Sequence, residues 1–226
     1  KPNTKLLKLL NESILYEDEY ILAINKHAGI VVQGGRTNIS DLLGQIRYGE
    51  IFKIVHRLDR DTSGVMVFAR NAKVAQYLME EFRERRVKKT YLALTSGIPK
   101  ENIGVIDYPL VKRYIFGQEK VVVDESSPQI ATTYFSILEK LKHDVAYLKL
   151  QPITGRTHQL RVHLAHINCP ILGDGKYGGR KAFISGIVNK MHLHSYSLSL
   201  KLPNSKNINI TAPISEHIIR SIKSLS

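Results

Sequence analysis

Residues 56–64, with the sequence HRLDRDTSG, combine acids and bases in a way that could do chemistry. The segment stands between two apolar runs, at 51–55 and 65–69. Nearby arginines favour the ionised form of an aspartate, which suits a nucleophile, a base or an ion-pair partner better than a proton donor. The pattern leaves two interpretations of Asp59 open: a structural salt bridge and a catalytic carboxylate. Gly64 predicts an unusual backbone angle in either case.

A second segment, PITGRTHQLRVHLAH at 152–166, gathers groups that bind anions. A Thr-Gly turn leads into a helix predicted over 158–168, and the helix start would offer backbone N–H groups beside cationic side chains. The polar residues concerned are Arg156, His158, Gln159 and Arg161. The alternative is an amphipathic helix with its leucines inward and these polar side chains in solvent.

The segment KKTYLAL at 88–94 places Tyr91 among apolar residues on a predicted strand. Tyr91 is either a half-buried strand residue or a ring that stacks on a base near a reacting group. The histidines do not have the spacing of a zinc pair with an adjacent glutamate, so no metal site is predicted. The histidines considered are His158, His163, His166, His192 and His194.

Short apolar and β-branched runs predict the strands that must position these segments. Helices are predicted at 40–48, with Ser40 as its cap, at 72–86, where Val74, Leu78 and Phe82 form an apolar stripe, and at 214–225. The predicted strands are 20–25, 51–55, 65–69, 87–97, 120–124, 131–141, 145–153, 191–203 and 208–213. Since short turns join most of them, the pattern favours an α+β fold with a mixed or mostly antiparallel sheet.

The 226-residue chain has a net charge of +13 and a pI of about 9.7. Cations cluster at 83–89 and in the group Arg47, Lys53, Arg57 and Arg60. Such charge favours a polyanionic partner, either RNA or DNA. The alternative is a chain that simply uses much lysine.

Other classes of protein have no support in the sequence. It contains neither GxxxxGK[ST] nor GxGxxG, so a nucleotide cofactor is not expected. Cys169 is the single cysteine and reads as a small packed side chain in a reducing compartment. No apolar run is long enough to cross a bilayer, and no signal peptide is recognised. We expect a cytoplasmic protein that does not bind membranes.

Taken together, these motifs resemble those of the RluA family of pseudouridine synthases, in its RluC- and RluD-like rRNA branch. The resemblance covers nearly the whole chain from Ile14. It rests on HRLDRDTSG, on KKTYLAL, and on GRTHQLR about a hundred residues after the first motif. The segments ILYEDEYILAINKHAGIVVQGG, CPILGDGKYGG and MHLHSYSLSL match the family in the same order.

The resemblance implies a pseudouridine synthase catalytic fold, α+β, with a bent, mixed or mostly antiparallel sheet flanked by helices and loops. It implies conversion of uridine to pseudouridine without a cofactor or a metal. Asp59 matches the family's nucleophile, which attacks ribose C1′ or uracil C6 or assists through a glycal route. Arg156 matches its cationic partner, and Tyr91 matches the active-site tyrosine. Arg57 matches a residue that enters the RNA stack after the target base has left.

The expected RNA-binding residues are His56, Arg57, Arg60, His158, Gln159 and Arg161. The expected organisation is a linker or leading arm at 1–12 and a pseudouridine synthase catalytic domain at 13–226. The S4-like RNA-binding domain that precedes such a linker in relatives is expected to be absent. We expect a monomer whose RNA partner is 23S rRNA, a choice favoured by HRLDRDTSG and the preceding VVQGG. The alternatives are a tRNA or dual rRNA/tRNA target, a non-catalytic RNA-binding or ribosome-assembly module, and a hydrolase that uses Asp59 on a glycosidic bond.

Overall fold

The computed structural model describes residues 4–32 and 38–226 and divides into two compact units. The first contains the chain up to Lys88 together with Ser195–Ile214, and the second contains Lys89–His194 and Ser215–Ser226. The described residues do not include 1–3 of the expected leading arm or 33–35 of the VVQGG segment.

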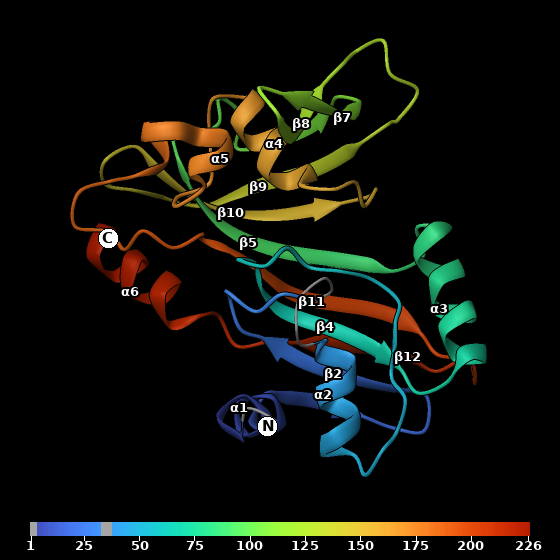
Figure 1. Cartoon of the computed structure of the whole chain (residues 1–226). Helices are drawn as coiled ribbons and strands as arrows, with labels where there is room; N and C mark the ends of the chain where they lie inside the picture. The colour runs from blue at the N-terminus through green and yellow to red at the C-terminus, as the bar shows by residue number, and fades with distance from the viewer. Residues whose placement is uncertain (1–3, 33–37) are drawn as a thin grey trace. The chain divides into compact units, whose positions relative to one another are not determined.

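The first unit is built on a sheet with the strand order β1-β2-β4-β11 (Figure 1). These strands are β1 (Ile14–Glu17), β2 (Ile21–Lys26), β4 (Ser63–Ala69) and β11 (Leu193–Lys201). In addition, β12 (Asn207–Thr211) pairs with β11, and the short β3 (Lys53–Ile54) pairs with β4. The β1–β2, β2–β4, β3–β4 and β11–β12 pairs are antiparallel.

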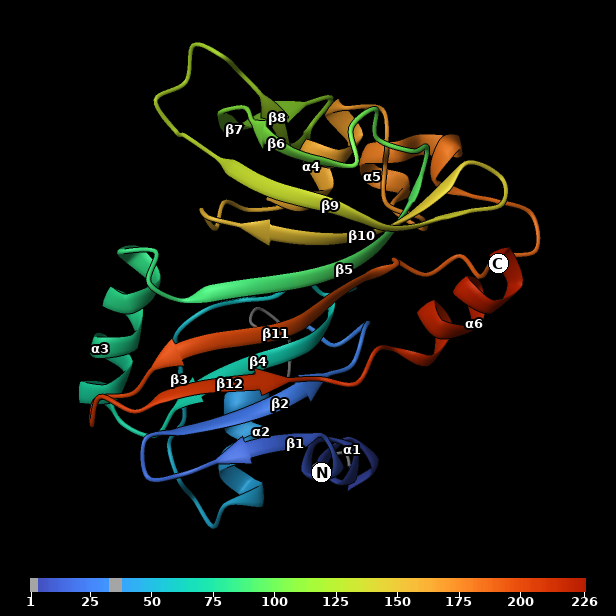
Figure 2. The same ribbon diagram turned by 180° about the vertical axis from the view of Figure 1, so that it is seen from behind.

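The core of the first unit lies around β4, all of whose residues are buried. Helix α3 (Ala72–Arg83) adds Val74 and Leu78 to this core. The Asn71 side chain caps α3 by accepting a hydrogen bond from the Val74 N–H at 3.0 Å. Helix α2 (Ile39–Ile46) covers one face of the sheet, in front of β2 in Figure 1 and behind it in Figure 2.

The second unit contains a sheet in the order β5-β10-β9-β6. Its strands are β5 (Lys88–Ser96), β10 (Val145–Pro152), β9 (Thr132–Leu141) and β6 (Ile103–Asp107), and each neighbouring pair is antiparallel. Helices α4 (Gln159–His166) and α5 (Gly175–Gly178) lie on one face of this sheet (Figures 1 and 2). The remaining elements are the hairpin β7 (Leu110–Ile115) and β8 (Gln118–Val123), the 3₁₀ turn η1 (Gly179–Ala182) and helix α6 (Glu216–Leu225).

The predicted α+β class and antiparallel pairing are confirmed. Three local predictions differ from the structure. Residues 4–12 form helix α1, with Leu10 fully buried, although the sequence was interpreted as an arm. Asn38 caps α2 through a 3.2 Å hydrogen bond from the Ser40 N–H, so the predicted cap at Ser40 is wrong. Strands β6 and β7 were not predicted at all.

A membrane span is also not found in the described ranges, because none of their helices is long and apolar enough to cross a bilayer.

Candidate active site

The loop that carries Asp59 has a fixed inner side and an accessible outer side. Leu58 and Thr62 are buried, whereas Asp59 is half-buried and Arg57 is exposed. The Thr62 N–H donates to the Asp59 carbonyl at 3.1 Å, which closes a tight turn around the two charged residues between them. The loop backbone is therefore ordered locally while the Asp59 side chain stays within reach of solvent.

Gly64 ends this loop where the chain enters β4, and no other residue fits there. Its φ is +110°, and a Cβ built on it would lie 2.1 Å from the carbonyl oxygen of Ser195 in β11. The Ser195 hydroxyl donates to the Val65 carbonyl at 3.2 Å, beside the same contact. The expectation that Gly64 shapes the loop is thus confirmed by both its backbone angle and its contact.

A buried lysine also anchors the loop. Lys26, the last residue of β2, has no exposed surface. Its Nζ donates to the carbonyls of His27 at 3.0 Å, Ile30 at 3.0 Å and Arg60 at 2.9 Å. The Arg60 carbonyl also accepts from the Gly29 N–H at 2.8 Å. This lysine was missed because a cation after an apolar strand usually extends into solvent.

Burial lowers the pKa of Lys26 to about 8, and the charges of Asp61 and Asp59 act in the opposite direction. At neutral pH the ammonium form predominates and offers three N–H groups to three carbonyl oxygens. Lys26 therefore both holds the loop and places a positive charge in the environment of its two carboxylates.

His56 and Arg60, both expected to bind RNA, are held by neighbouring groups. The Val67 N–H donates to Nε2 of His56 at 2.9 Å, and the imidazole stacks on Phe82 at a centroid distance of 4.8 Å. The Arg60 guanidinium makes two 3.0 Å hydrogen bonds to the Asp61 carboxylate. His56 is thus partly structural, and the exposed Arg57 is the side chain of this loop best placed to reach a partner.

In the second unit, Gln159 organises the GRTHQ turn. Its Oε1 accepts from the Thr154 hydroxyl at 2.7 Å and from the Arg156 N–H at 3.0 Å. Its Nε2 donates to the Thr132 carbonyl and to the Thr133 hydroxyl, both at 3.0 Å. Every polar atom of this buried amide is therefore used inside the protein, so Gln159 positions the turn and is not exposed for RNA.

Arg156 projects from this turn as an exposed side chain. Its Nε donates to the Ile130 carbonyl at 3.2 Å, which restrains the orientation of the guanidinium. Tyr91 is half-buried on β5, opposite Leu150 of β10. Lys89, on the same face of β5 as Tyr91, donates to the Thr154 carbonyl at 2.8 Å, so β5 is tied to the turn that carries Arg156.

Arg161, also expected to bind RNA, is buried in a bidentate ion pair. Its Nε and Nη2 each donate to the Asp174 carboxylate at 2.8 Å, and both residues are almost inaccessible. His158, in a left-handed conformation before α4, contacts the Tyr177 hydroxyl through Nδ1 at 2.6 Å. The alternative of an amphipathic helix with solvated polar residues is also wrong, because Gln159, Arg161 and His163 are all buried.

His163 and His192 of the second unit have partners of their own. His163 contacts the Thr133 hydroxyl and the Tyr108 carbonyl, each at 3.0 Å, and burial lowers its pKa. His192 contacts the Ser221 hydroxyl at 2.8 Å, and burial lowers its pKa to about 4. In the part of the chain that the structure describes, no group of three or more potential metal ligands occurs.

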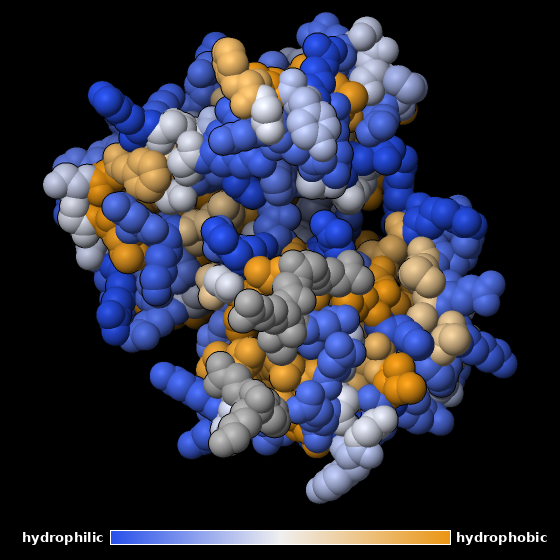
Figure 3. Space-filling model, viewed as in Figure 1, coloured by the Kyte–Doolittle hydropathy of each residue, from blue (hydrophilic) through white to orange (hydrophobic). Residues whose placement is uncertain are grey.

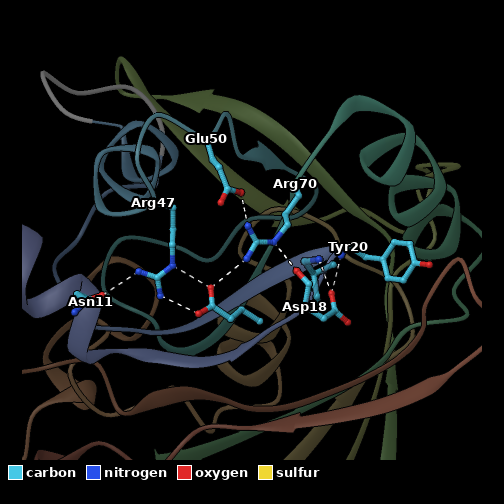
Figure 4. Close-up of polar contacts among 8 residues, drawn as sticks. Asn11, Asp18, Tyr20, Arg47, Glu50 and Arg70 are labelled. Atoms are coloured by element: carbon cyan, nitrogen blue, oxygen red, sulfur yellow. Dashed lines mark hydrogen bonds and ion pairs between the residues drawn. The ribbon is translucent and has the colours of Figure 1, made fainter.

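Acids partly neutralise the cationic clusters expected from the sequence. Arg47 makes two 3.0 Å hydrogen bonds to Glu17, which also pairs with Arg70 (Figure 4). Arg70 pairs with Glu50 as well. In the 83–89 segment, Arg86 pairs with the buried Glu81 at 2.8 Å. Hydrophilic residues nevertheless cover much of the face shown in Figure 3, and the chain keeps a net charge of +13.

The predicted catalytic residues are divided between the two units. Asp59 belongs to the first unit, and Tyr91 and Arg156 belong to the second. Within each unit the geometry is specific: an accessible carboxylate on a loop held by a buried cation, and an exposed guanidinium on a turn held by a buried amide. Comparison with known proteins defines the class of protein to which these two features belong.

The sequence profile of the family described as RNA pseudouridylate synthase matches residues 20–166. A Buchnera aphidicola protein named ribosomal large subunit pseudouridine synthase C is 37% identical over 98% of this chain and 73% of its own length. A Rickettsia typhi protein of the same name is 33% identical over 95% of this chain and 72% of its own length. The chain belongs to the pseudouridine synthases, in the RluA family that its motifs predicted.

Solved structures agree with this assignment. The structure titled human RNA pseudouridylate synthase domain containing 4 has a TM-score of 0.80 and 32% sequence identity, covering 97% of this chain and 95% of that one. A second, human RNA pseudouridylate synthase domain containing 1, has a TM-score of 0.75 and 30% identity over 89% and 82% of the two chains. The chain is therefore an RNA pseudouridine synthase with the fold expected for one.

Proposed function

We propose that this enzyme converts uridine to pseudouridine in large-subunit rRNA. The observation that carries the choice of RNA is the name shared by its curated relatives from Buchnera, Rickettsia and Haemophilus, ribosomal large subunit pseudouridine synthase C. The basic charge suits a phosphate-rich substrate. The mapping of pseudouridines described below distinguishes this rRNA target from the alternatives of a tRNA target and of a dual rRNA/tRNA target.

In the proposed mechanism Asp59 is the nucleophile. Its carboxylate adds to ribose C1′ or to uracil C6, or assists through a glycal, and the glycosidic bond between C1′ and N1 breaks. The uracil turns, a bond forms between C1′ and C5, and the bond between Asp59 and the substrate breaks, which regenerates the carboxylate. The C5 proton is lost while N1 gains one. The product has the composition of the substrate, so the reaction needs no oxidant and no group donor.

The ordered loop around Asp59 supports its proposed role as the nucleophile. Lys26 holds the loop through the Arg60 carbonyl and Gly64 fits it closely against Ser195, so the carboxylate is presented without a large ordering cost when RNA binds. We assign to Arg156 the role of its cationic partner. To Tyr91 we assign stacking on the uracil and assistance in removing the C5 proton. Arg57, exposed on the same loop, is assigned to the RNA stack that the target base leaves.

The reaction is tested with an unmodified large-subunit rRNA transcript that carries tritium at uridine C5. The enzyme should release tritium to water and produce no free uracil, because the base is rejoined to the same ribose. Free uracil would instead indicate a glycosidic hydrolase. Binding of the transcript without tritium release would indicate a non-catalytic RNA-binding module.

The target is tested by mapping pseudouridines in rRNA and tRNA from cells with and without the gene. We expect sites in large-subunit rRNA to disappear and tRNA sites to remain. Loss confined to tRNA would contradict the proposed target, and loss in both would show dual specificity.

A further inference from the structure

The turn at the end of the β7–β8 hairpin contains a residue type that its backbone conformation disfavours. The register pairs Ile115 with Gln118, so Phe116 and Gly117 are the two central residues of the turn. Their φ angles are +49° and +76°, as in a type I′ hairpin turn. Such turns favour Asn-Gly or Asp-Gly, because a bulky L-residue is strained at positive φ. A phenylalanine at this position is locally unfavourable.

Packing does not explain Phe116 either. Its side chain is fully exposed, with a relative accessibility of 102%, and Tyr114 beside it is 79% exposed. An aromatic ring contributes to folding mainly through the apolar surface that it buries, and neither ring buries much here. The tip thus combines a strained backbone with apolar rings in solvent, a combination found at functional positions.

The strands of the hairpin show a second unfavourable feature. Arg113 and Lys120 are directly opposite each other in the register, so their side chains emerge on the same face. Like charges in directly opposed positions destabilise a strand pair. Asp124 pairs with Arg113, so Arg113 has an acidic partner of its own. On the other face Lys112 pairs with Glu119 at 3.1 Å, as expected for a pair that supports the hairpin.

The base of the hairpin is held firmly within the second unit. Leu110 and Val121 are buried against Ala131 and Val162, the latter in α4 (Figure 1). The Val121 N–H donates to the Tyr177 hydroxyl at 3.3 Å, and this hydroxyl is the group that His158 contacts. Lys176 donates to the Glu119 carbonyl at 2.9 Å. The tip is consequently presented from a fixed base that is continuous with the GRTHQ motif.

We infer that the β7–β8 hairpin is a second RNA-contacting element, in which Phe116 stacks on an unpaired base and the Arg113–Lys120 face binds the neighbouring phosphates. This inference rests on the proposed RNA substrate and extends it to a contact away from the isomerised uridine. Aromatic side chains recognise unpaired nucleotides by stacking on their faces, and adjacent cations bind the backbone that links them. One partner therefore accounts for both locally unfavourable features of the hairpin.

The decisive variant is Phe116→Asn, because asparagine suits the turn better than phenylalanine but cannot stack comparably. Its melting temperature should be unchanged or about 2–4 °C higher. Its affinity for an unmodified large-subunit rRNA transcript should fall by about 5- to 100-fold, the range for loss of one stacked base. Affinity for a blunt RNA duplex, which offers no unpaired base within its length, should change much less.

Tyr48→Asn is the matched control, because Tyr48 is also fully exposed, has a φ of +53° and precedes a glycine with positive φ. It lies in the first unit, at the end of α2. We expect this variant to bind the transcript like the unchanged enzyme. An equal loss of affinity in both variants, or no loss in Phe116→Asn, would contradict the inference.

Lys120→Gln tests the phosphate contact separately. It should weaken binding to all RNAs and reduce the slope of log K against log salt by roughly 0.7–0.9. An unchanged slope would remove the phosphate contact from the inference. Because these readouts measure binding, they remain informative if tritium release fails. If the unchanged enzyme releases tritium and Phe116→Asn binds the transcript with full affinity, the hairpin contact is refuted. The proposed function then remains intact.

Discussion

Lys26 holds its charge in a fully buried position where three main-chain carbonyls replace water. A buried ammonium without such acceptors would be costly. Two of the acceptors belong to the segment that follows β2, and the third is Arg60 in the loop that carries Asp59. One side chain thereby joins two segments far apart in sequence, and the position of Asp59 depends on it.

Lys26→Met should preserve most of the side-chain volume but leave carbonyls at His27 and Ile30 without their donor. We expect the free energy of unfolding to fall by about 1–3 kcal/mol. The single-turnover rate should fall at least about tenfold at temperatures where the variant is folded. Lys73→Met, an exposed change in α3, is the control and should affect neither quantity. An active Lys26→Met enzyme would show that the loop does not need this anchor.

The rate should also depend on pH through Lys26, whose pKa is about 8. Below that pH the ammonium supplies three donors, and above it the neutral amine has only two donors for three carbonyls. The single-turnover rate of the unchanged enzyme should therefore decline as the pH rises through about 8. In Lys26→Met this step should be absent, and a step of equal size in the variant would assign it to another group.

Arg156 is exposed and makes one hydrogen bond through its side chain, so Arg156→Ala should reduce activity far more than stability. We expect less than about 1 kcal/mol of destabilisation, as for most surface positions. Arg156→Lys should recover little of the rate, because an ammonium lacks the planar fork. Denaturant unfolding and single-turnover rates measure the two effects. Parallel losses of stability and activity would favour a structural role.

At the scale of single residues, the sequence indicated which side chains could take part in chemistry, but it did not indicate which of them are buried. Gln159 and Arg161 looked like solvent-facing ligands because they are polar and stand beside Arg156. Both are buried, since Thr154 and Asp174 supply partners that lie five and thirteen positions away. Lys26 was missed because a cation after an apolar strand usually extends into solvent, and the main-chain carbonyls that accept its hydrogen bonds leave no trace in the side-chain pattern.

At the scale of elements, the strongest patterns gave correct predictions. Helix α3 and strand β4 have, respectively, a continuous apolar stripe and a continuous apolar run, and both are present. The β7 strand was missed because it belongs to a two-stranded hairpin, whose exposed residues leave little alternation. Helix α1 was missed because its apolar residues pack through tertiary contacts that its basic composition does not indicate.

Helix α6 should make the stability of the protein sensitive to acid. His192 contacts Ser221 of α6, and burial lowers the pKa of His192 to about 4 from 6.5. Between these values the unfolded chain binds the proton and the folded chain does not, so stability falls as the pH falls from about 6.5 to about 4. The full effect is about 3 kcal/mol for this residue. Burial also lowers the pKa of His217, which acts in the same direction.

Urea unfolding at pH 7 and pH 5 tests this acid sensitivity. The difference in unfolding free energy between the two pH values should be smaller in His192→Gln than in the unchanged protein. His143→Gln, at an exposed turn, is the control and should retain the original difference. An unaltered difference in His192→Gln would show that other groups cause the acid sensitivity.

At the scale of the whole molecule, the chain divides into two compact units that each contribute predicted catalytic residues. The family and its α+β fold were predictable because several motifs occur in a fixed order along nearly the whole chain. The division into units was not predicted, because the first unit is completed by Ser195–Ile214, more than a hundred residues after its first part. The domain boundary expected after residue 12 stays a prediction.

The central proposal is that Asp59 attacks the nucleotide. Its most direct test compares Asp59→Asn with Asp61→Asn in single-turnover tritium release from the labelled rRNA transcript. We predict no detectable release from Asp59→Asn, a loss of at least about 1,000-fold, with RNA affinity and melting temperature nearly unchanged. Asp61→Asn, which loses the ion pair with Arg60 and one of the two acidic charges near Lys26, should keep most of the rate at neutral pH. Turnover by Asp59→Asn close to that of the unchanged enzyme, or equal losses in both variants, would contradict the account.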